Sequence, residues 1–330
     1  MTNTASDCVT KIYTPFDELA YVEKDSRFSE LFYKMTSLGV RHCPVIDPNT
    51  QECFRIVSRR DLVTLVPPGN MLIPQEVQDA TGIKISPSIL INLIDELGDE
   101  TVDNLFSDQN LIAVSPDDKI IKAVELLSVR QDVAGKKIYI SCLPVMEGKK
   151  LLGFISYTDV LKKFIKHQDS YLKTRVDRIA TMDADDQPLW TLHKAQCLRD
   201  AIMRLANVRS LPVVTKPKSK RLEGFVEDIQ VMACNHRSFT NQLGNLGVEY
   251  FMTPVERLYT PMPGTILEKC LDKFYDSSEG MYPPPTLAVC DTEEGKEKNL
   301  LGVLSYVDIL KKWKEEFTLA QRNSESVEGN

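Results

Sequence analysis

The sequence lacks the features that would mark a membrane, secreted or nucleic-acid-binding protein. No run of about 18 apolar residues occurs, so no membrane span is expected. The N-terminus, MTNTASDCVTKIY, lacks the basic and then apolar order of a signal peptide. Lys and Arg total 40 against 47 Asp and Glu, a net charge of −7, so no nucleic-acid or anionic-membrane partner is expected. A cytoplasmic or nuclear protein follows.

Patterns for catalysis and metal binding are also missing. The eight cysteines form no Cys-x-x-Cys pair, and the four histidines have no ligand spacing. Free thiols are therefore expected in place of disulfides or a metal site. No Walker loop, no Gly-x-Gly-x-x-Gly motif and no nucleophile beside a base is present. The sequence predicts no catalytic residue, no enzyme and no required cofactor.

What the sequence does contain is an internal repeat. Residues 153–164 read GFISYTDVLKKF and residues 302–313 read GVLSYVDILKKW, with the Gly, Ser, Tyr, Asp, Leu and both Lys identical. Each segment follows an amphipathic helical pattern, an apolar strand, a polar turn and a second strand. Two weaker copies occupy residues 26–65 and 196–233. The repeating unit is helix, strand, strand, helix.

The copies are too short to fold alone. A chain of about 60 residues buries little surface, so four copies are expected to stack and share cores. A helical pattern over residues 160–179 is expected to run continuously between the halves, with their boundary near residue 170. An amphipathic piece at 86–97 is expected to pack against the first module, and a surface for a protein partner is the alternative. The polar tail from about residue 318 is expected to be disordered.

Three copies place a serine where the second strand ends and an aspartate three residues later. One interpretation is a helix cap, which contributes about 1 kcal/mol. The other is a nucleotide site, in which the helix N-terminus and serine face a phosphate and the carboxylate holds ribose hydroxyls. The two interpretations are compatible. The pairs are Ser58 and Asp61, Ser156 and Asp159, and Ser305 and Asp308.

A strand with Leu-Pro-Val, a strand ending Gly-h-h-Ser (h is apolar) and then x-x-Asp-h-Leu resembles the CBS domain family. The resemblance covers most of residues 8–315. It implies an α/β (α+β) fold of four tandem CBS domains, each a small sheet with two packing helices, paired into two Bateman modules. The implied segments are repeat 1 at 8–66, an insert at 67–99, repeat 2 at 100–168, repeat 3 at 172–236, repeat 4 at 245–317 and a disordered tail at 318–330. Repeats 1 and 2 would form the first module (8–168), and repeats 3 and 4 the second (172–317).

The same resemblance implies adenosine-containing ligands in clefts between paired repeats. The third copy departs from the motif, because Glu227 and Gln230 replace the serine and aspartate. That cleft is expected to be empty or to bind differently. The implied ribose ligands are Asp61, Asp159 and Asp308, and the implied phosphate-side residues are Ser58, Ser156, Ser305, Arg41 and Arg209. For the two arginines, a surface cation is the alternative.

Four copies with a long insert after the first also resemble the gamma subunit of AMP-activated protein kinase. Residues 39–45, GVRHCPV, are similar to its first repeat, which implies that Arg41 faces phosphate. Basic pairs common in that family are replaced by Ser141-Cys142 and Pro285-Thr286, so few central cations are expected. Tyr157 and Tyr306 are expected to be packing residues.

The function implied by this resemblance is a non-catalytic, energy-sensing regulatory protein. Its regulatory ligand would be an adenine nucleotide (AMP, ADP or ATP). Its protein partner would be a kinase or another regulated protein, or a second copy in a homodimer. The alternative is a CBS-fold scaffold or interaction protein that has lost its ligand.

Overall fold

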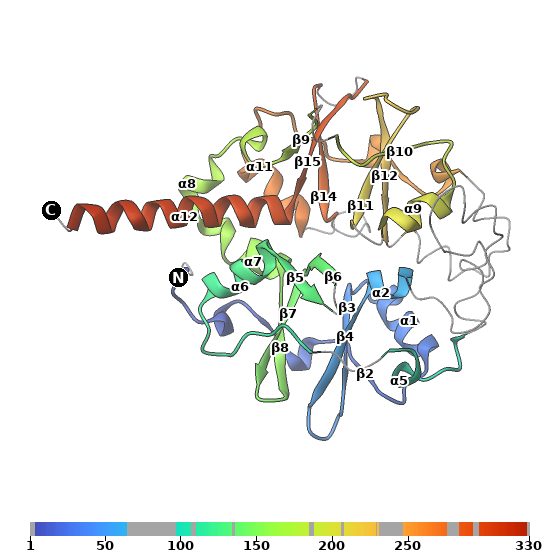
Figure 1. The fold of residues 1–330 in the computed structure, drawn as a ribbon, viewed down its shortest axis with the longest axis vertical. Helices are drawn as coiled ribbons and strands as arrows, with labels where there is room; N and C mark the ends of the chain where they lie inside the picture. The colour runs from blue at the N-terminus through green and yellow to red at the C-terminus, as the bar shows by residue number, and fades with distance from the viewer. Residues whose placement is uncertain are drawn as a thin grey trace.

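The computed structural model describes most of the chain outside the long insert. Those residues are 4–64, 97–106, 110–133, 136–184, 188–205, 208–228, 230, 247–275, 284–292 and 297–328. The predicted amphipathic piece at 86–97 lies outside them except for Leu97, which is buried in a core with residues of repeat 1. Figure 1 shows the first half of the chain, in blue and green, below the second half, in yellow to red.

The helix–strand–strand–helix unit is clearest in repeat 1. It consists of α1 (Phe28–Ser37), β3 (His42–Ile46), β4 (Cys53–Ser58) and α2 (Arg59–Thr64), with β2 (Val22–Glu23) parallel to β3. In α1 the buried residues Phe28, Leu31, Phe32 and Met35 recur at helical spacing and face the core. Strands β3 and β4 form an antiparallel hairpin.

The other repeats follow the same order, although the segment after Asp228 that is predicted as the last helix of repeat 3 lies largely outside the described residues. Repeat 2 adds a hairpin of β5 (Arg130–Val133) and β6 (Lys136–Tyr139) before its first core strand. Repeat 2 has α6 (Ile120–Ser128), β7 (Cys142–Glu147), β8 (Lys150–Ser156) and α7 (Tyr157–Lys163). Repeat 3 has β10 (Leu192–His193), α9 (Leu198–Leu205), β11 (Ser210–Val214) and β12 (Leu222–Glu227). Repeat 4 has α11 (Glu268–Leu271), β14 (Thr286–Cys290), β15 (Leu300–Ser305) and α12 (Tyr306–Glu328).

Short entry strands are exchanged between the repeats of a pair. The strand before repeat 1, β1 (Thr14–Pro15), pairs with β8 of repeat 2. In the second half, β9 (Thr181–Met182) pairs with β15, and β13 (Thr253–Pro254) pairs with β12. The entry segment of repeat 2 includes the short helix α5 (Val102–Leu105), which packs in the core of repeat 1. Each repeat therefore needs its partner to complete its fold.

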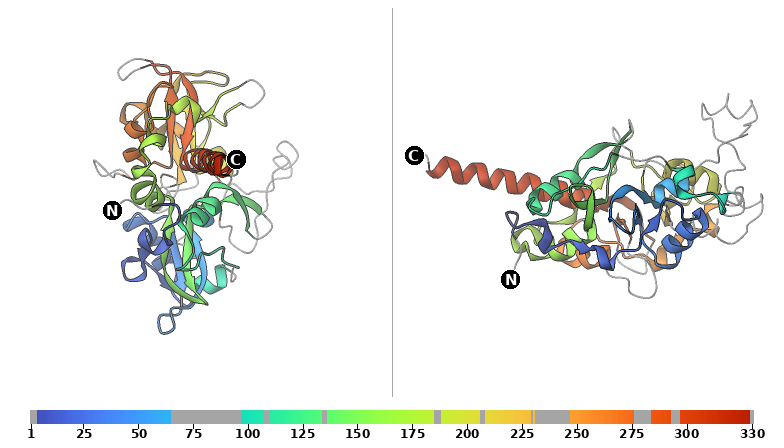
Figure 2. Two further views of the ribbon diagram at one scale, coloured as in Figure 1. Left: turned by 90° about the vertical axis from the view of Figure 1, so that its left-hand side faces the viewer. Right: turned by 90° about the horizontal axis from the view of Figure 1, so that it is seen from below.

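Two large cores connect the halves. One combines residues of repeats 1 and 3, and the other combines residues of repeats 2 and 4. Helix α12 of repeat 4 packs on α6 of repeat 2, with Lys314 at 3.4 Å from Glu125. Figure 2 shows the two halves above one another, with α12 seen end-on. The prediction that the copies stack and share cores is confirmed.

The helix predicted over residues 160–179 is broken, which corrects the sequence analysis. After α7 the chain forms the short turns η4 (Ile165–His167), α8 (Asp169–Leu172) and η5 (Val176–Arg178). Ile165, Tyr171 and Val176 are all buried in the core shared by repeats 2 and 4. One straight helix would turn some of them toward solvent, so tertiary packing overrides the helical periodicity.

The expectation of a disordered tail from residue 318 is also wrong in the structure, because α12 continues to Glu328. The segment that leaves the body of the molecule contains no Pro or Gly before Gly329, and strong helix formers such as Leu319 and Ala320 extend it. Figures 1 and 2 show this helix projecting beyond the two halves.

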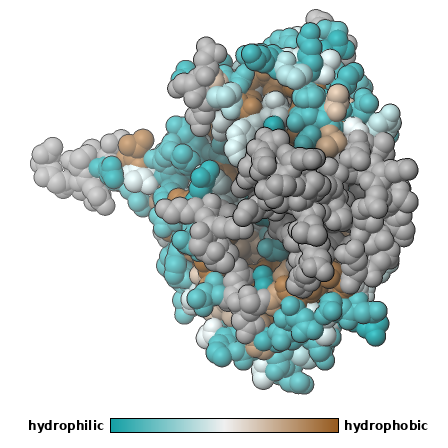
Figure 3. Space-filling model, turned by 45° about the vertical axis from the view of Figure 1, so that its right-hand side comes forward, coloured by the Kyte–Doolittle hydropathy of each residue, from teal (hydrophilic) through white to brown (hydrophobic). Residues whose placement is uncertain are grey.

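In the described ranges no helix combines the length and hydropathy needed to cross a bilayer, and no His, Cys, Asp and Glu cluster could hold a metal ion. The seven described cysteines are free thiols, while Cys234 lies outside these ranges. On the face in Figure 3 the coloured surface is mostly hydrophilic, with hydrophobic residues in small areas.

Candidate functional site

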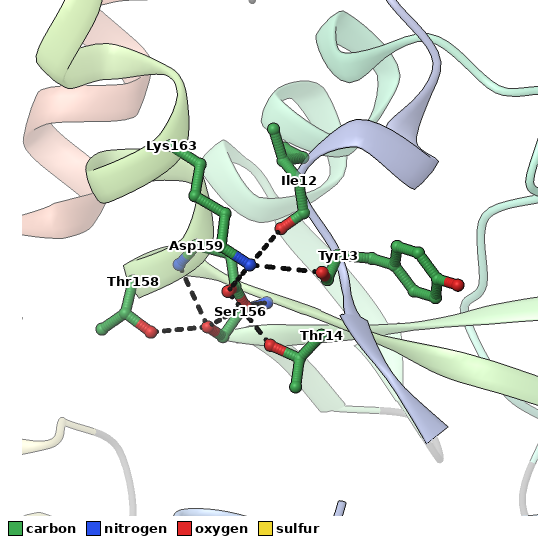
Figure 4. A network of polar contacts seen from close by, with 7 residues as sticks. All are labelled: Ile12, Tyr13, Thr14, Ser156, Thr158, Asp159 and Lys163. Carbon is green, nitrogen blue, oxygen red and sulfur yellow. Dashed lines mark hydrogen bonds and ion pairs between the residues drawn. The ribbon is translucent and has the colours of Figure 1, made fainter. Parts of the chain in front are cut away.

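The repeated serine and aspartate form a helix cap in repeat 2. The Ser156 hydroxyl and backbone N–H donate to Asp159 Oδ2 at 2.6 and 2.8 Å. The backbone N–H of Asp159 donates to the Ser156 hydroxyl at 3.2 Å, which completes a capping box at the start of α7. Figure 4 shows this network, in which Lys163 approaches the other carboxylate oxygen at 3.1 Å.

Repeats 1 and 4 contain the same cap. Asp61 Oδ2 accepts from the backbone N–H and hydroxyl of Ser58 at 2.7 and 2.8 Å. Asp308 Oδ2 accepts from the corresponding groups of Ser305 at 2.8 and 2.6 Å. The capping interpretation is therefore confirmed for all three pairs. It leaves the second carboxylate oxygen of each aspartate for another partner.

In repeats 2 and 4 that partner is a threonine of the exchanged strand, and in repeat 3 the corresponding threonine contacts Gln230. Figure 4 shows one of these contacts, in which Thr14 reaches from β1 of repeat 1 to the cap of repeat 2. Each contact fastens one repeat to the helix cap of its partner. The pairs are Thr14 with Asp159 at 3.1 Å, Thr181 with Asp308 at 3.0 Å, and Thr253 with Gln230, the substitute for aspartate in repeat 3, at 2.8 Å.

The glycine of the Gly-h-h-Ser motif lies where the exchanged strand crosses. A Cβ atom at Gly153 would lie 2.3 Å from the carbonyl oxygen of Thr14, and Gly224 and Gly302 have similar close contacts. Repeat 1 has Arg55 at the equivalent position. Among the described residues, β4 accordingly pairs only with β3. The residue equivalent to Thr14 in the entry segment of repeat 2 is Ser107, which lies outside the described residues.

Asp61 lines a cavity of about 100 Å³ between repeats 1 and 2, called here the Asp61 cleft. It combines a carboxylate, a serine at a strand-to-helix junction, two guanidinium groups and apolar side chains such as Ile56. These are groups that can hold a hydroxyl-bearing anion with an apolar portion. The polar lining consists mainly of Ser58, Arg60 and Asp61 from repeat 1, Ser141 from repeat 2 and Arg209 from repeat 3.

The residue that directly follows the capping serine, or Glu227 in its place, contacts the equivalent residue of a repeat in the other half. Tyr157 and Tyr306 stack with ring centroids 4.2 Å apart, which joins repeats 2 and 4. Arg59 and Asp228 occupy the same positions in repeats 1 and 3 and form an ion pair at 3.6 Å. Only 1% of the Arg59 side chain is exposed. The prediction that the tyrosines are packing residues is confirmed.

Arg41 and Arg209 flank this tyrosine stack. Each guanidinium carbon lies 5.6 Å from a ring centroid, Arg41 over Tyr157 and Arg209 over Tyr306. Arg41 also donates a hydrogen bond to the Tyr157 hydroxyl. Cation–π contact in a partly buried site holds both side chains in place. Both arginines are thus turned inward, where they could meet a ligand.

Sequence reasoning missed Arg59 and Arg60. The expectation of few central cations considered only basic pairs before the first core strand of a repeat. The structure corrects it. A second cavity, of about 10 Å³, is lined by Arg41, Arg59, Arg60 and Arg209. The sequence does contain a signal for this cluster. The capping serine is followed by two arginines in repeat 1, whereas it is followed by a tyrosine in repeats 2 and 4.

His42 and Ser141 form a neutral polar pair in the wall of the Asp61 cleft. Ser141 Oγ lies 2.8 Å from His42 Nε2. Burial, together with the positive charges of Arg209 and Arg41, holds the pKa of His42 well below its usual range. The imidazole is therefore uncharged at neutral pH. The positive charge described in this cleft belongs to Arg60 and Arg209.

Glu227, which replaces the serine in repeat 3, is buried with only 7% of its surface exposed. Burial raises the pKa of Glu227 to about 8, and the attraction of Arg41 only partly opposes this effect. The carboxyl group is thus largely protonated at neutral pH. It therefore repels an anion less than the ionised glutamate that the sequence would predict.

This shift predicts that stability falls as the pH rises from about 4.5 through about 8, because the folded state binds the Glu227 proton more tightly. In the Glu227→Gln variant that fall should disappear. At pH 9 the variant is expected to exceed the wild type in free energy of unfolding by roughly 1–3 kcal/mol. Urea unfolding at pH 5, 7 and 9 measures it. Glu223→Gln is the matched control, and parallel wild-type and Glu227→Gln profiles would contradict the prediction.

The predicted site residues therefore divide into two groups. Ser58, Asp61 and Arg209 line the Asp61 cleft, and Arg41 adjoins it in the second cavity. The other predicted residues are engaged in caps and are not among the described residues that line either cavity. They are Ser156, Asp159, Ser305 and Asp308.

One segment matches a known family directly. Residues 102–166 match the CBS domain model, and this segment includes α6, the β7–β8 hairpin and the Ser156 cap. No curated protein matches the chain.

Two solved structures match almost the whole chain. Protein MJ1225 from Methanocaldococcus jannaschii, a proposed archaeal homologue of g-AMPK, covers 93% of this chain and 100% of its own length, with a TM-score of 0.68 and 18% identity. An uncharacterized conserved protein from Pyrococcus horikoshii covers 92% and 99%, with a TM-score of 0.54 and 15% identity. At these identities the likeness shows the fold, which is a mixed helix-and-sheet fold of tandem repeats.

Proposed function

Because this chain contains a CBS domain and folds as tandem CBS repeats, we propose that it is a non-catalytic regulatory protein. It binds an adenine nucleotide or a related adenosine ligand in the Asp61 cleft and relays binding to a protein partner. A kinase is the first candidate, as for a gamma-like subunit, since MJ1225 is described as related to g-AMPK. Another regulated protein or a second copy of the chain is the alternative partner.

The observation that carries the proposal is the convergence of Ser58, Asp61 and Arg209 on one cavity. Asp61 Oδ2 accepts from Ser58, and the carboxylate borders the open space in which ribose hydroxyls could donate to it. Ser58 and the guanidinium groups lie on the phosphate side of such a ligand. At about 100 Å³ the cavity is smaller than a nucleotide, so part of the ligand would stay exposed at its mouth.

The same cleft supports the proposed relay. Arg209 comes from repeat 3, whereas the other lining residues named above come from repeats 1 and 2. A ligand that contacts Arg209 touches both halves of the molecule at once. It would favour the arrangement in which the halves bring these groups together, and a partner could sense that shift.

A scaffold that has lost its ligand is the second candidate, and one observation favours it. Asp159 and Asp308 are occupied by their own serines and by threonines of exchanged strands. These contacts hold paired repeats together without a ligand. We propose Asp159 and Asp308 as ribose sites only where a nucleotide displaces the threonine.

Calorimetric titration of nucleotide-stripped protein with AMP, ADP, ATP and S-adenosylmethionine distinguishes the candidates. The regulatory function predicts saturable binding of at least one adenine nucleotide, with competition between the ligands that bind. If none of the four ligands binds to folded, stripped protein, the scaffold function is correct and the regulatory function is not.

A further inference from the structure

The projecting helix α12 (Figure 1) borders an open groove of about 490 Å³, called here the α6–α12 groove. Its apolar lining consists of Val129, which directly follows α6, and Leu319 of α12, with 43% and 58% of their surfaces exposed. Two large exposed side chains in one groove form an apolar patch that a partner can cover. The other lining residues are Ser128 from α6 and Lys311, Lys314, Glu315, Thr318 and Arg322 from α12.

The groove uses the face of α12 that the core leaves free. Its lining residues recur at positions 311, 314, 315, 318, 319 and 322, which is the spacing of one helix face. Trp313 and Phe317 lie on the opposite face, in or against the core shared by repeats 2 and 4. No described residue after Phe317 belongs to that core. Because helical segments shorter than about 12 residues are marginally stable alone in water, a partner in the groove would stabilise the last turns of α12.

Some polar groups of the groove are satisfied within the chain. Lys314 Nζ lies 3.4 Å from a Glu125 carboxylate oxygen, and the Thr318 hydroxyl donates to the Lys314 carbonyl oxygen at 2.9 Å. Glu315 lies 3.9 Å from Lys312 on the same helix, and both side chains are partly exposed. Exposed ion pairs of this kind contribute little to stability, so Glu315 can change partner at low cost.

The charges along the groove face are self-complementary. Glu315 precedes Thr318 by three residues, and Arg322 follows Leu319 by three residues. When two copies of α12 run antiparallel about a two-fold axis between positions 318 and 319, each Glu315 lies opposite the Arg322 of the other copy. A parallel pair of helices would place like charges opposite each other, which is unfavourable.

The charges farther from this axis fit the same arrangement. Lys311 lies seven residues before Thr318, and the sequence has Glu325 six residues after Leu319, within α12. The antiparallel pair therefore brings position 311 of one helix next to position 325 of the other. A partner helix with charge of one sign would match only the residues of opposite sign, whereas a second copy of α12 matches both.

We propose that the α6–α12 groove is a dimer interface, filled by the antiparallel α12 of a second copy of the chain. The two-fold symmetry gives both copies the same contacts, with Leu319 on the apolar patch of the other copy and a Glu315–Arg322 pair on each side. The groove shares no described lining residue with the Asp61 cleft, so the proposal is independent of any ligand there. Residues 311–325 span roughly 20 Å of helix, which makes a small interface, so dimerisation should depend on protein concentration.

Sedimentation equilibrium of the full chain from about 1 to about 200 µM measures this association. A reversible monomer–dimer equilibrium is expected. A monomer at every concentration would overturn the proposal and leave the groove for another protein. Arg322→Glu turns both pairs across the interface into like-charge pairs and should raise the Kd of the dimer at least ~10-fold, and Glu315→Arg should do the same.

The double variant Glu315→Arg/Arg322→Glu exchanges the signs and restores complementarity, so its Kd should return to within ~3-fold of the wild type. Arg257→Glu changes an exposed arginine outside the groove and is the matched control, which should leave the Kd unchanged. Circular dichroism verifies that each variant is folded. If Arg322→Glu dimerises like the wild type, or the double variant stays as weak as the single ones, the two copies do not pair through this groove.

Discussion

The Asp61→Asn variant is expected to lose affinity for AMP by about 10- to 100-fold. In the proposed complex the carboxylate would accept from the two ribose hydroxyls through charge-assisted bonds, which contribute roughly 1.5–3 kcal/mol more than no bond. Asparagine is nearly isosteric, and its amide oxygen can still accept from the backbone N–H of Ser58. The variant should therefore stay folded while the ligand loses its strongest polar contact. Calorimetric titration with AMP measures the loss.

The matched control for this experiment is Asp118→Asn. Asp118 belongs to another Ser-x-x-Asp segment, a turn before α6 in which its Oδ2 accepts from the backbone N–H of Ser115 at 2.7 Å, and it lines neither cavity. A general effect of losing a carboxylate that accepts from a serine N–H would lower stability in both variants and leave AMP binding equal. If Asp61→Asn binds AMP as tightly as Asp118→Asn does, Asp61 holds no ribose.

The Gly153→Val variant is expected to lose about 3 kcal/mol or more of its free energy of unfolding, an overpacking effect at the upper end of the usual range. A Cβ atom at this position would lie 2.3 Å from the Thr14 carbonyl oxygen and 2.5 Å from the Tyr13 ring. The first contact is with backbone, which cannot move away without unpairing β1 from β8. Loss of that strand would also remove the Thr14 contact with Asp159. Urea unfolding followed by circular dichroism measures the change.

Gly264→Ala serves as the control, because a Cβ atom at Gly264 meets nothing within 4 Å. Its stability should stay within about 0.5 kcal/mol of the wild type, as for a typical surface substitution. Equal stability of Gly153→Val and the wild type would show that β1 does not cross β8 in solution. The exchange of strands described above would then be wrong for this pair of repeats.

The secondary structure was predictable wherever one copy of the repeating unit could be compared with another copy. The apolar spacing of Phe28, Leu31 and Met35 predicts α1, and the alternation of apolar residues and turns predicts the β3–β4 hairpin. The errors arose in the segments that follow the repeated motif, where no second copy is available for comparison. Tertiary packing breaks the pattern after Lys163, and local helix propensity carries α12 beyond residue 318.

The candidate site was predictable only in part. The motif identified Ser58 and Asp61 because a serine and an acid at a helix start leave a local, repeating pattern. It could not show that Arg209 joins them, since that residue lies in another repeat and reaches the cleft only through the packing of the two halves. It also could not pair Arg59 with Asp228, which meet across the same interface.

Local sequence patterns are sufficient to predict the unit of helix, strand, strand and helix, its fourfold repetition and the caps, because these depend on spacings within about 60 residues. Long-range packing settles which of the equivalent aspartates lines the Asp61 cleft among the described residues. Exchanged strands bring Thr14 and Thr181 onto two of them. Arg55 stands where a crossing strand requires glycine, and Asp61 lines the cleft. That difference depends on contacts between segments far apart in the chain, which no local pattern encodes.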